Sequence, residues 1–489
     1  MTPSASLLTI LGPLAVAFLS AIAFVPVARR LAIRIDVVAR PRADRWHRTV
    51  VPMLGGVAIG LATLLTGLIF GVGMSLPAVL FPSMAVFLMG LVDDILQLRP
   101  ATKLVAQIAA AAALVYFGFR LNWLESRLLD SVLTMVWVVG LTNAFNLLDN
   151  MDGLCAGIAF IVAMMLIAGF WTGVSRDNAV AEMTLLAALA GAAAGFLVYN
   201  FPPASIFMGD SGSLLFGFSL AALTLGHEGV RASRSDVLSV IAGPAFVLLI
   251  PIFDTTLVTV ARLLSGRSPA WGGRDHSSHR LVAIGLSERN AVLVLWMLAS
   301  VGGAIGLLLR NFSPDWSLLV GGVYLIGMCI FAVYLARVRV YEDLPAGQIT
   351  NGFTLLQSNF LNRRRVVEVL VDVSLIGASY YFAMQLVFKD PEAYLRNAEV
   401  FYQTLPVIIT TQLLAFFARG LYRGVWQPFV RGDINKVLEG VLAGTLIAQV
   451  FLLAYYGSFA VSWMVVLLQA LLVSAGVIVS RLIGRQFPP

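Results

Sequence analysis

Carboxylates stand at the ends of two apolar segments in this sequence, where they could bind a metal ion, hold a phosphate or transfer a proton. Asp93 and Asp94 are adjacent at the end of the first segment. Asn146, Asp149 and Asp152 follow at intervals of three residues at the end of the second. If that stretch is helical, the spacing places the three side chains near one face. The same pattern also fits an ordinary polar helix terminus followed by an Asn-Met-Asp-Gly turn.

Two further polar clusters follow later apolar segments. Asn200 ends one such segment, and Asp210 lies beyond it in a Met-Gly-Asp-Ser-Gly turn. The glycines of that turn would let the backbone approach a ligand closely. Residues 274–280 read Arg-Asp-His-Ser-Ser-His-Arg and contain His276 and His279. Any one cluster could be a solvated loop, but four clusters on the same side of a membrane favour a shared site.

These residue types suit the binding of a hard cation and a phosphate. Mg²⁺ takes oxygen ligands and is usually held by one or two carboxylates together with substrate phosphates. Asn146 could add an amide oxygen, and Lys103 and the loop arginines would meet phosphate oxygens. His276 and His279 could ligate a metal, but oxygen ligands dominate the clusters, so we interpret the histidines as phosphate donors or nucleotide contacts. The pattern predicts diphosphate chemistry on a lipid carrier, and it leaves transfer and hydrolysis both open.

The amino-acid composition indicates that these clusters belong to a membrane protein. Hydrophobic residues make up 59% of the chain and charged residues 12%, whereas a soluble domain is roughly 45–50% apolar and about 25% charged. Cys155 and Cys329 lie within apolar runs, so we expect neither a disulfide framework nor a cysteine metal site. The net charge of +7 reports orientation in the membrane rather than nucleic-acid binding. The predicted fold class is therefore all-α, a polytopic integral membrane protein.

Long apolar runs predict eleven transmembrane helices and a further four-helix segment. They divide the chain into a membrane domain at residues 1–340, a cytoplasmic linker at 341–365 and a four-helix transmembrane annex at 366–489. The absence of an alternating strand pattern excludes a soluble sugar transferase fold. The predicted cores are 7–28, 54–74, 77–95, 103–119, 131–148, 154–173, 182–200, 212–227, 238–262, 290–309, 316–336, 366–387, 401–418, 437–456 and 461–480.

The charges of the connections predict an orientation. The connection after the first span is rich in arginine, so the positive-inside rule places it in the cytoplasm and the N-terminus outside. Counting onward, all four polar clusters and the C-terminus fall on the cytoplasmic side. A transporter or flippase of lipid-linked saccharide is the alternative, but it would place ionisable residues near the middle of the bilayer, often in broken helices. Here they stand at span ends, which favours an enzyme.

Five motifs in a fixed order carry a resemblance to a known family, over about residues 1–340. They are His47 with Val51-Pro-Met-Leu-Gly-Gly-Val57, Leu91-Val-Asp-Asp-Ile-Leu-Gln-Leu-Arg-Pro100, Asn143-Ala-Phe-Asn-Leu-Leu-Asp-Asn-Met-Asp-Gly-Leu154, Phe207-Met-Gly-Asp-Ser-Gly-Ser213 and Asp275-His-Ser-Ser-His-Arg-Leu281. Together they resemble the polyprenyl-phosphate N-acetylhexosamine-1-phosphate transferases. The resemblance implies a bacterial plasma-membrane enzyme that moves a sugar 1-phosphate, above all HexNAc-1-phosphate, from a UDP-sugar to undecaprenyl phosphate. It implies release of UMP, a place as the first membrane step of a cell-envelope polysaccharide pathway, and Mg²⁺ as cofactor, with Mn²⁺ as the alternative ion.

The resemblance also implies roles for single residues. By position, Asp93 and Asp94 match the catalytic aspartate pair, near the lipid phosphate and the metal, and Asn146 and Asp210 match metal-binding positions. The family often shows a run of three histidines, which two serines interrupt here, so the sugar donor and the division of labour between the two histidines stay open. The substrate-binding residues implied are His47, Lys103, Asp149, Asp152, Asn200, His276, His279 and Arg280.

The C-terminal third carries a separate resemblance. The motif Arg419-Gly-Leu-Tyr-Arg-Gly-Val-Trp426 is similar to the membrane segment of nucleotide-sugar dehydratases and epimerases of polysaccharide biosynthesis, over about residues 360–485. No Gly-x-Gly-x-x-Gly follows a strand, so we expect no dinucleotide-binding catalytic domain in this sequence. We interpret the segment as a structural or dimerisation annex, the latter through a homodimer, with docking of a partner protein as the alternative.

Overall fold

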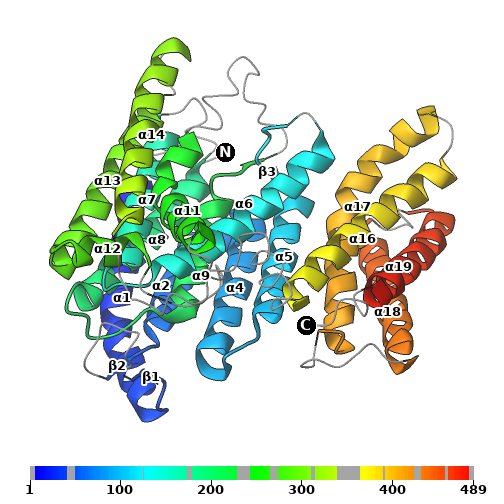
Figure 1. Cartoon of the computed structure of the whole chain (residues 1–489), viewed down its shortest axis with the longest axis horizontal. Coiled ribbons are helices and arrows are strands. Elements are labelled where there is room, and N and C mark those ends of the chain that lie inside the picture. Colours follow the sequence, from blue (N-terminus) through cyan, green and yellow to red (C-terminus); the bar gives the residue numbers. More distant parts are fainter. Residues whose placement is uncertain are drawn as a thin grey trace. The chain divides into compact units, whose positions relative to one another are not determined.

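The computed structural model confirms an all-α fold. It describes residues 6–40, 50–124, 126–172, 179–227, 243–264, 273, 275–309, 314–338, 364–388, 391–422, 431–456 and 461–483. Within these residues the only strands are four of two residues each. The structure is shown in Figure 1.

Most described elements are helices that run for several turns. The first part of the chain contains α1 (Leu8–Arg34), β1 (Val38–Ala39), β2 (Val51–Pro52), α2 (Gly55–Ile69), α3 (Val72–Ser75), α4 (Pro77–Leu96), α5 (Pro100–Tyr116), β3 (Phe119–Arg120), α6 (Arg127–Leu148), α7 (Leu154–Thr172), α8 (Val180–Asn200), α9 (Gly209–Ala222) and β4 (Gly226–His227). The second part contains α11 (Leu249–Leu264), α12 (Ser277–Ala283), α13 (Glu288–Leu308), α14 (Pro314–Ala336), α16 (Arg364–Val387), α17 (Pro391–Ala418), α18 (Arg431–Tyr456) and α19 (Trp463–Ile483).

Eleven of the described helices are long and apolar enough to cross a membrane. A spanning helix needs about 20 predominantly apolar residues because the hydrocarbon core is about 30 Å thick. Seven of the eleven lie between residues 8 and 336, and the other four are α16 to α19. The chain is therefore a multi-pass membrane protein, as its composition predicts.

Four predicted spans correspond to shorter helices, namely α2, α5, α9 and α11. The helix α2 ends at Ile69 because the chain turns at Gly71, whose φ of 74° is left-handed, before α3 begins. The helix α9 has 14 residues, or about 21 Å at 1.5 Å per residue, which is less than the hydrocarbon thickness. Its residues from Ser211 to Ala222 are all buried, so protein surrounds α9.

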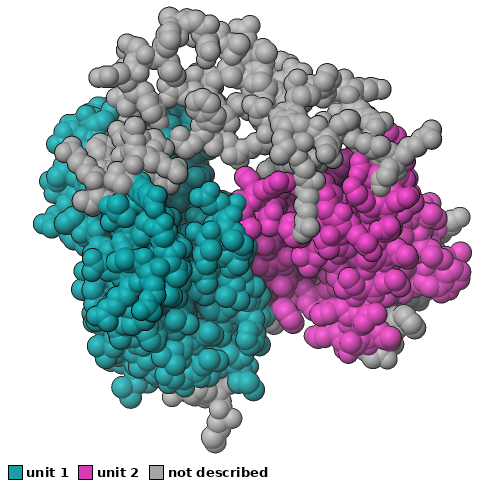
Figure 2. All heavy atoms as spheres, turned by 90° about the horizontal axis from the view of Figure 1, so that it is seen from below, with its two compact units in different colours: residues 1–97, 121–123, 136–355 teal, residues 98–120, 124–135, 356–489 magenta. Residues whose placement is uncertain are grey.

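The described chain forms two compact units (Figure 2). The first contains residues 1–97, 121–123 and 136–355, and the second contains residues 98–120, 124–135 and 356–489. In the first unit, α8 is the most enclosed spanning helix and packs against α1, α2 and α7, while α9 packs against α2 and α4. This packing brings the C-terminal end of α4 to the N-terminal end of α9.

The second unit joins the four C-terminal helices with α5. Helices α16 and α17 both pack against α5, and α16 also packs against α19. Inside the unit, the fully buried Asp372 accepts hydrogen bonds from Arg481 Nη2 (2.6 Å) and from the hydroxyl of Tyr422 (2.8 Å). Pairing of this kind offsets the cost of burying ionisable groups in a membrane segment. The boundaries at residues 340 and 366 stay a prediction.

Candidate active site

The carboxyl of Asp94 binds the N-terminal end of α9. Its Oδ1 accepts a hydrogen bond from the backbone N–H of Asp210 (2.7 Å). Its Oδ2 accepts from the backbone N–H of Ser211 (3.0 Å) and from the Ser211 hydroxyl (2.7 Å). A helix N-terminus carries unsatisfied N–H groups and the positive end of the helix dipole, so a carboxylate there is favourable. Asp94 thus fixes the first turn of α9, which carries Asp210.

Gly209 allows this close approach. Its φ of 74° lies in the left-handed region, which glycine adopts at no steric cost. A Cβ atom at this position would lie 2.7 Å from both carboxyl oxygens of Asp94 and 2.8 Å from the carbonyl oxygen of Met53. A larger residue would therefore clash with the groups that hold the start of α9.

Backbone hydrogen bonds join the loop before α9 to the start of α2 and the residues just before it. The N–H of Phe207 donates to the carbonyl of Pro52 (2.8 Å), and the N–H of Gly55 donates to the carbonyl of Phe207 (2.9 Å). The N–H of Gly56 donates to the carbonyl of Met208 (2.8 Å). Two motifs of the sequence, the first and the fourth, are therefore in direct contact. His47, which belongs to the first motif, lies outside the described residues.

Asn146 connects α6 to α9. Its side-chain Nδ2 donates a hydrogen bond to the hydroxyl of Ser213 (3.1 Å). The Ser213 hydroxyl donates in turn to the carbonyl of Gly209 (3.1 Å). This assignment of the amide uses its nitrogen in the contact with α9, so Oδ1 is the atom that could meet a cation, as the resemblance implies.

Asn200 and Asp152 brace the loops between the helices. The buried Asn200 accepts a hydrogen bond from the N–H of Gly153 (2.9 Å) and donates to the carbonyl of Ile206 (2.9 Å). Asp152 Oδ2 accepts from the N–H of Ala204 (2.8 Å). Both polar atoms of the Asn200 side chain thus stabilise loop backbone, and its predicted contact with substrate stays a prediction.

The carboxyl of Asp149 has a pKa raised to about 8. Burial is the main cause, because protein atoms surround the carboxyl although the residue keeps some exposure at the surface. The negative charges of Asp210, Asp94 and Asp152 raise the pKa further. Three other carboxylates therefore lie within electrostatic range of Asp149, in a place where a cation would be favourable.

The donor set fits a cation that is shared with a substrate. Among the residues that the structure describes, no three His, Cys, Asp or Glu side chains gather into a group that could hold a metal ion alone. Mg²⁺ does not need such a group, because it keeps several waters and binds one or two carboxylates together with substrate phosphates. Asp210 and the amide oxygen of Asn146 would supply hard oxygen ligands of the type that Mg²⁺ requires.

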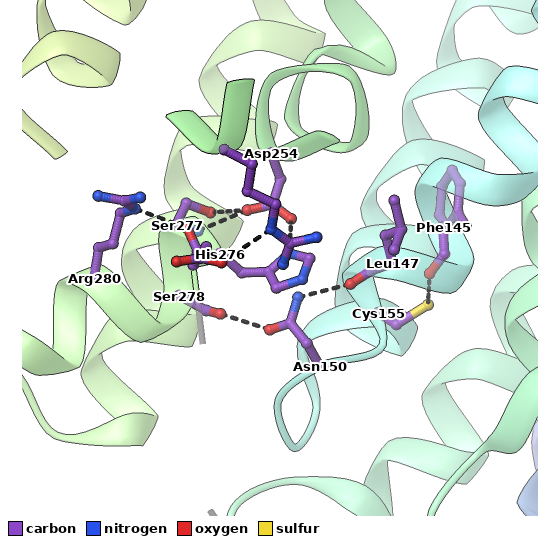
Figure 3. Close-up of polar contacts among 11 residues, drawn as sticks. Phe145, Leu147, Asn150, Cys155, Asp254, His276, Ser277, Ser278 and Arg280 are labelled. Carbon is purple, nitrogen blue, oxygen red and sulfur yellow. Dashed lines mark hydrogen bonds and ion pairs between the residues drawn. The ribbon is translucent and has the colours of Figure 1, made fainter. Parts of the chain in front are cut away.

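The histidine segment, residues 275–280, is held by Asp254, a residue of α11 that was not among the candidates from the sequence. Asp254 Oδ2 lies 2.7 Å from His276 Nδ1 (Figure 3). Its Oδ1 accepts from the backbone N–H (2.7 Å) and the hydroxyl (2.6 Å) of Ser277. A carboxylate inside an apolar run is costly without a partner, and this was the signal in the sequence that could have identified Asp254. His279 is also buried, with its ring edge-on to that of His276 at 6.1 Å.

Arg280 binds the C-terminal end of α14. Its Nη1 donates to the carbonyls of Leu335 (2.8 Å), Ala336 (3.2 Å) and Val338 (3.0 Å). Its Nε donates to the carbonyl of Asp275 (2.7 Å). The last carbonyls of a helix lack partners within the helix, and a cation there also interacts favourably with the dipole. These contacts indicate a structural role for Arg280, and its predicted contact with substrate stays a prediction.

A hydrogen bond joins the histidine segment to the aspartate loop, residues 149–153 between α6 and α7. The hydroxyl of Ser278 donates to Asn150 Oδ1 (2.6 Å), and Asn150 Nδ2 donates to the carbonyl of Leu147 at the end of α6 (2.8 Å) (Figure 3). Because Asn150 lies between Asp149 and Asp152 in the chain, this contact ties the two parts of the site together.

The first unit therefore contains most of the predicted site residues, carried by helix ends and the loops beside them. Lys103 lies in the first turn of α5, in the second unit. Those in the first unit are Asp93, Asp94, Asn146, Asp149, Asp152, Asn200, Asp210, His276, His279 and Arg280.

Comparison with known proteins places this arrangement in a family. Residues 76–227 match the model of glycosyl transferase family 4. The chain is 31% identical to a probable undecaprenyl-phosphate N-acetylglucosaminyl 1-phosphate transferase of Bacillus subtilis, over 65% of this chain and 89% of the relative. It is 36% identical to the decaprenyl-phosphate N-acetylglucosaminephosphotransferase of Mycolicibacterium smegmatis, over 61% and 81%. It is 27% identical to the undecaprenyl-phosphate alpha-N-acetylglucosaminyl 1-phosphate transferase of Salmonella typhi, over 66% and 92%. With its helix-end carboxylates and this extent of similarity, the chain belongs to glycosyl transferase family 4.

Proposed function

We propose that this protein transfers a sugar 1-phosphate, in the first place a HexNAc-1-phosphate, from a UDP-sugar to undecaprenyl phosphate and releases UMP. The observation that carries the proposal is the group of carboxylates around the start of α9, where Asp94 binds the backbone of Asp210 and Asp149 lies within electrostatic range of both. Such a group suits a cation bound jointly with a diphosphate. The names of the relatives support a polyprenyl-phosphate acceptor and an N-acetylglucosamine phosphate as the group transferred.

The chemistry is a displacement at phosphorus. An oxygen of the lipid phosphate attacks the β-phosphorus of the UDP-sugar, and the bond from that phosphorus to the bridging oxygen breaks, so that UMP leaves with the bridging oxygen. A phosphate monoester has a second pKa near 6, so most of the acceptor is already a dianion at neutral pH. The attacking oxygen therefore needs positioning rather than removal of a proton, and catalysis comes mainly from positioning and electrostatic stabilisation.

The residues of the site take separate roles in this scheme. Asp210 and the amide oxygen of Asn146 would hold Mg²⁺, or Mn²⁺ as the alternative ion. A bound divalent cation neutralises charge on the diphosphate and on the leaving UMP. Asp94 orients the start of α9 and hence Asp210, because both of its oxygens bind that helix end. Asp93 keeps the catalytic role that the resemblance implies, near the acceptor phosphate.

The proposal also sets the site on the cytoplasmic side of the membrane. Arginine-rich connections predict a cytoplasmic location for the helix ends that carry the carboxylates and for the C-terminus, and an outside location for the N-terminus. Soluble UDP-sugars would then reach the site from the cytoplasm, and the lipid acceptor from the adjoining leaflet.

A donor panel tests the proposal. The purified full chain, in detergent with Mg²⁺ and undecaprenyl phosphate, is incubated separately with UDP-GlcNAc, UDP-GalNAc, UDP-glucose and UDP-galactose, and the released nucleotide is identified. We expect UMP with at least one N-acetylhexosamine donor and none with the Asp210→Ala variant or after chelation of divalent cations. Release of UDP would indicate a different class of transferase. If no donor releases a nucleotide, and vesicles that contain the protein move a lipid-linked saccharide across their membrane, the protein is a transporter.

A further inference from the structure

Asp254 is held in one orientation by three short contacts. Both the backbone N–H and the hydroxyl of Ser277 donate to Oδ1, at 2.7 and 2.6 Å. The remaining oxygen, Oδ2, lies 2.7 Å from Nδ1 of His276. The Asp254 side chain is 1% exposed and that of His276 is 7% exposed, so water does not compete for this contact. The carboxyl therefore cannot turn away from the imidazole without losing the bonds to Ser277.

This geometry determines which nitrogen of His276 carries a proton. An ionised carboxylate only accepts hydrogen bonds, so the short contact requires a proton on Nδ1. The other ring nitrogen, Nε2, is then the atom available for a ligand. A carboxylate that binds one nitrogen of a histidine in this way sets both the ring orientation and the tautomer.

The surroundings of His276 supply no second acidic partner among the contacts found for the described residues. His279 on the same helix meets the ring edge-on at 6.1 Å. The nearby carboxyl of Asp275 pairs with Arg262 (2.9 Å). Asn150, which faces the segment from the aspartate loop, is neutral and binds Ser278. Asp254 is thus the carboxylate that acts on the His276 ring.

We propose that Asp254 is a positioning residue for the transfer reaction, which holds the Nδ1 proton of His276 so that Nε2, when it carries a second proton, donates to a phosphate oxygen of the nucleotide sugar. The identity of that ligand rests on the proposed function; the position of the proton does not. With Asp254 opposite Nδ1, the ring can carry a second proton on Nε2 as a cation and make a charge-assisted hydrogen bond to phosphate. Asp254 acts through His276 and does not touch the reacting atoms itself.

The substitution Asp254→Asn distinguishes control of the His276 proton from a role of Asp254 in packing alone. The asparagine oxygen can still accept from Ser277, so its amide nitrogen must face Nδ1 and donate to it. His276 then has to carry its proton on Nε2 and loses the charge-assisted form. The variant Ser277→Ala is the matched control, because it removes the hydroxyl bond to Asp254 and leaves the contact between Asp254 and His276.

Nuclear magnetic resonance reads the proton directly. The full chain has four histidines, so labelling histidine with ¹⁵N gives few signals, and the variant His276→Gln assigns the one of interest. We expect Nδ1 of His276 to carry a proton in the wild type and in Ser277→Ala, and to lose it in Asp254→Asn. An unprotonated Nδ1 in the wild type overturns the proposal, and this outcome decides the matter even if Asp254→Asn does not fold.

A double-variant cycle tests whether Asp254 acts through His276. With a donor that supports turnover, Asp254→Asn should lower kcat/KM by about tenfold, since a charge-assisted bond is roughly twice as strong as a neutral one. Addition of Asp254→Asn to His276→Gln should then cause no further loss. If the two losses multiply, Asp254 supports the fold independently and the proposal fails. If no donor releases UMP, the proposed function fails, while the resonance experiment still decides the position of the proton.

Discussion

The side chain of Asp94 and the backbone of Asp210 are joined by a hydrogen bond of 2.7 Å between residues that are 116 positions apart in the chain. The contact sets one carboxylate against the positive end of the helix that carries another. Asp94 therefore has a structural role in the site, because it fixes the helix end that carries Asp210. Asp93 is its neighbour in sequence but need not share this role.

Substitutions of Asp93 and Asp94 should differ in their effects on stability. Asp94→Asn replaces one of the two oxygens that accept hydrogen bonds from the start of α9 with an NH2 group, so we expect a loss of about 1–3 kcal/mol in the free energy of unfolding, together with a large loss of activity. Asp93→Asn should reduce activity with a smaller loss of stability. Thermal unfolding in detergent and kcat measure the two effects. If raising the pH restores either variant to the wild-type rate, that residue acts as a base and the positioning role assigned here is wrong.

Substitution of Gly209 should be far more damaging than substitution of another glycine with the same backbone conformation. Gly71 has the same φ of 74°, but a Cβ there would meet nothing within 4 Å. Gly71→Ala should therefore cost only about 1 kcal/mol from the backbone. Gly209→Ala should cost more and abolish UMP release, because its Cβ would press on Asp94. Equal losses of stability in the two variants would show that the close approach to Asp94 has no importance.

The metal assignment predicts different results for Asp210 and Asn146. Asp210→Ala removes a charged oxygen ligand and should reduce activity to background while the protein stays folded. Asn146→Ala should raise the Mg²⁺ concentration needed for half-maximal activity and leave some turnover, since water can replace a neutral amide oxygen. Mg²⁺ titrations of activity, with thermal unfolding as the control for folding, check both. Near-normal turnover of Asp210→Ala would refute the assignment.

Asp149 should make the metal-free protein less stable as the pH rises. Its pKa is raised from 3.8 to about 8 in the folded protein, so between these values the folded state binds more protons than the unfolded state. Stability is then fully present below about pH 4 and is lost as the pH rises through about 8. In EDTA, the Tm of the wild type should fall between about pH 5 and about pH 9, and Asp149→Asn should reduce that fall. An unchanged pH dependence in the variant would contradict the raised pKa.

Arg280 offers a test between a structural and a substrate-binding role. Its guanidinium reaches three carbonyls at the end of α14 and the carbonyl of Asp275, which a lysine cannot match because it lacks the planar fork. Arg280→Lys should lower the Tm and leave KM for the UDP-sugar within about twofold of the wild type. A rise of KM by about tenfold with an unchanged Tm would instead support a contact with substrate.

The sequence was sufficient to predict the helices and the places where polar clusters end them. Length and hydropathy of an apolar run are local properties, so the eleven spanning helices found in the described part of the chain follow from composition and spacing. Motif order was likewise sufficient to indicate the family. The runs at 54–74 and 212–227 differ from the others for a physical reason: a left-handed Gly71 ends α2, and burial inside the unit, rather than contact with lipid, accounts for the apolar character of α9.

Tertiary structure decided which polar side chains support the site and how. Asn200 and Arg280 are predicted ligand contacts, and the structure adds hydrogen bonds from both side chains to loop and helix backbone. Asp254 lies inside an apolar run that was predicted only as a transmembrane span, yet it binds His276 and Ser277. Residue type and spacing show which groups could bind a ligand, whereas the partner of each group depends on contacts between distant helices. Those contacts depend on how whole helices pack together, and a short stretch of sequence does not specify this packing.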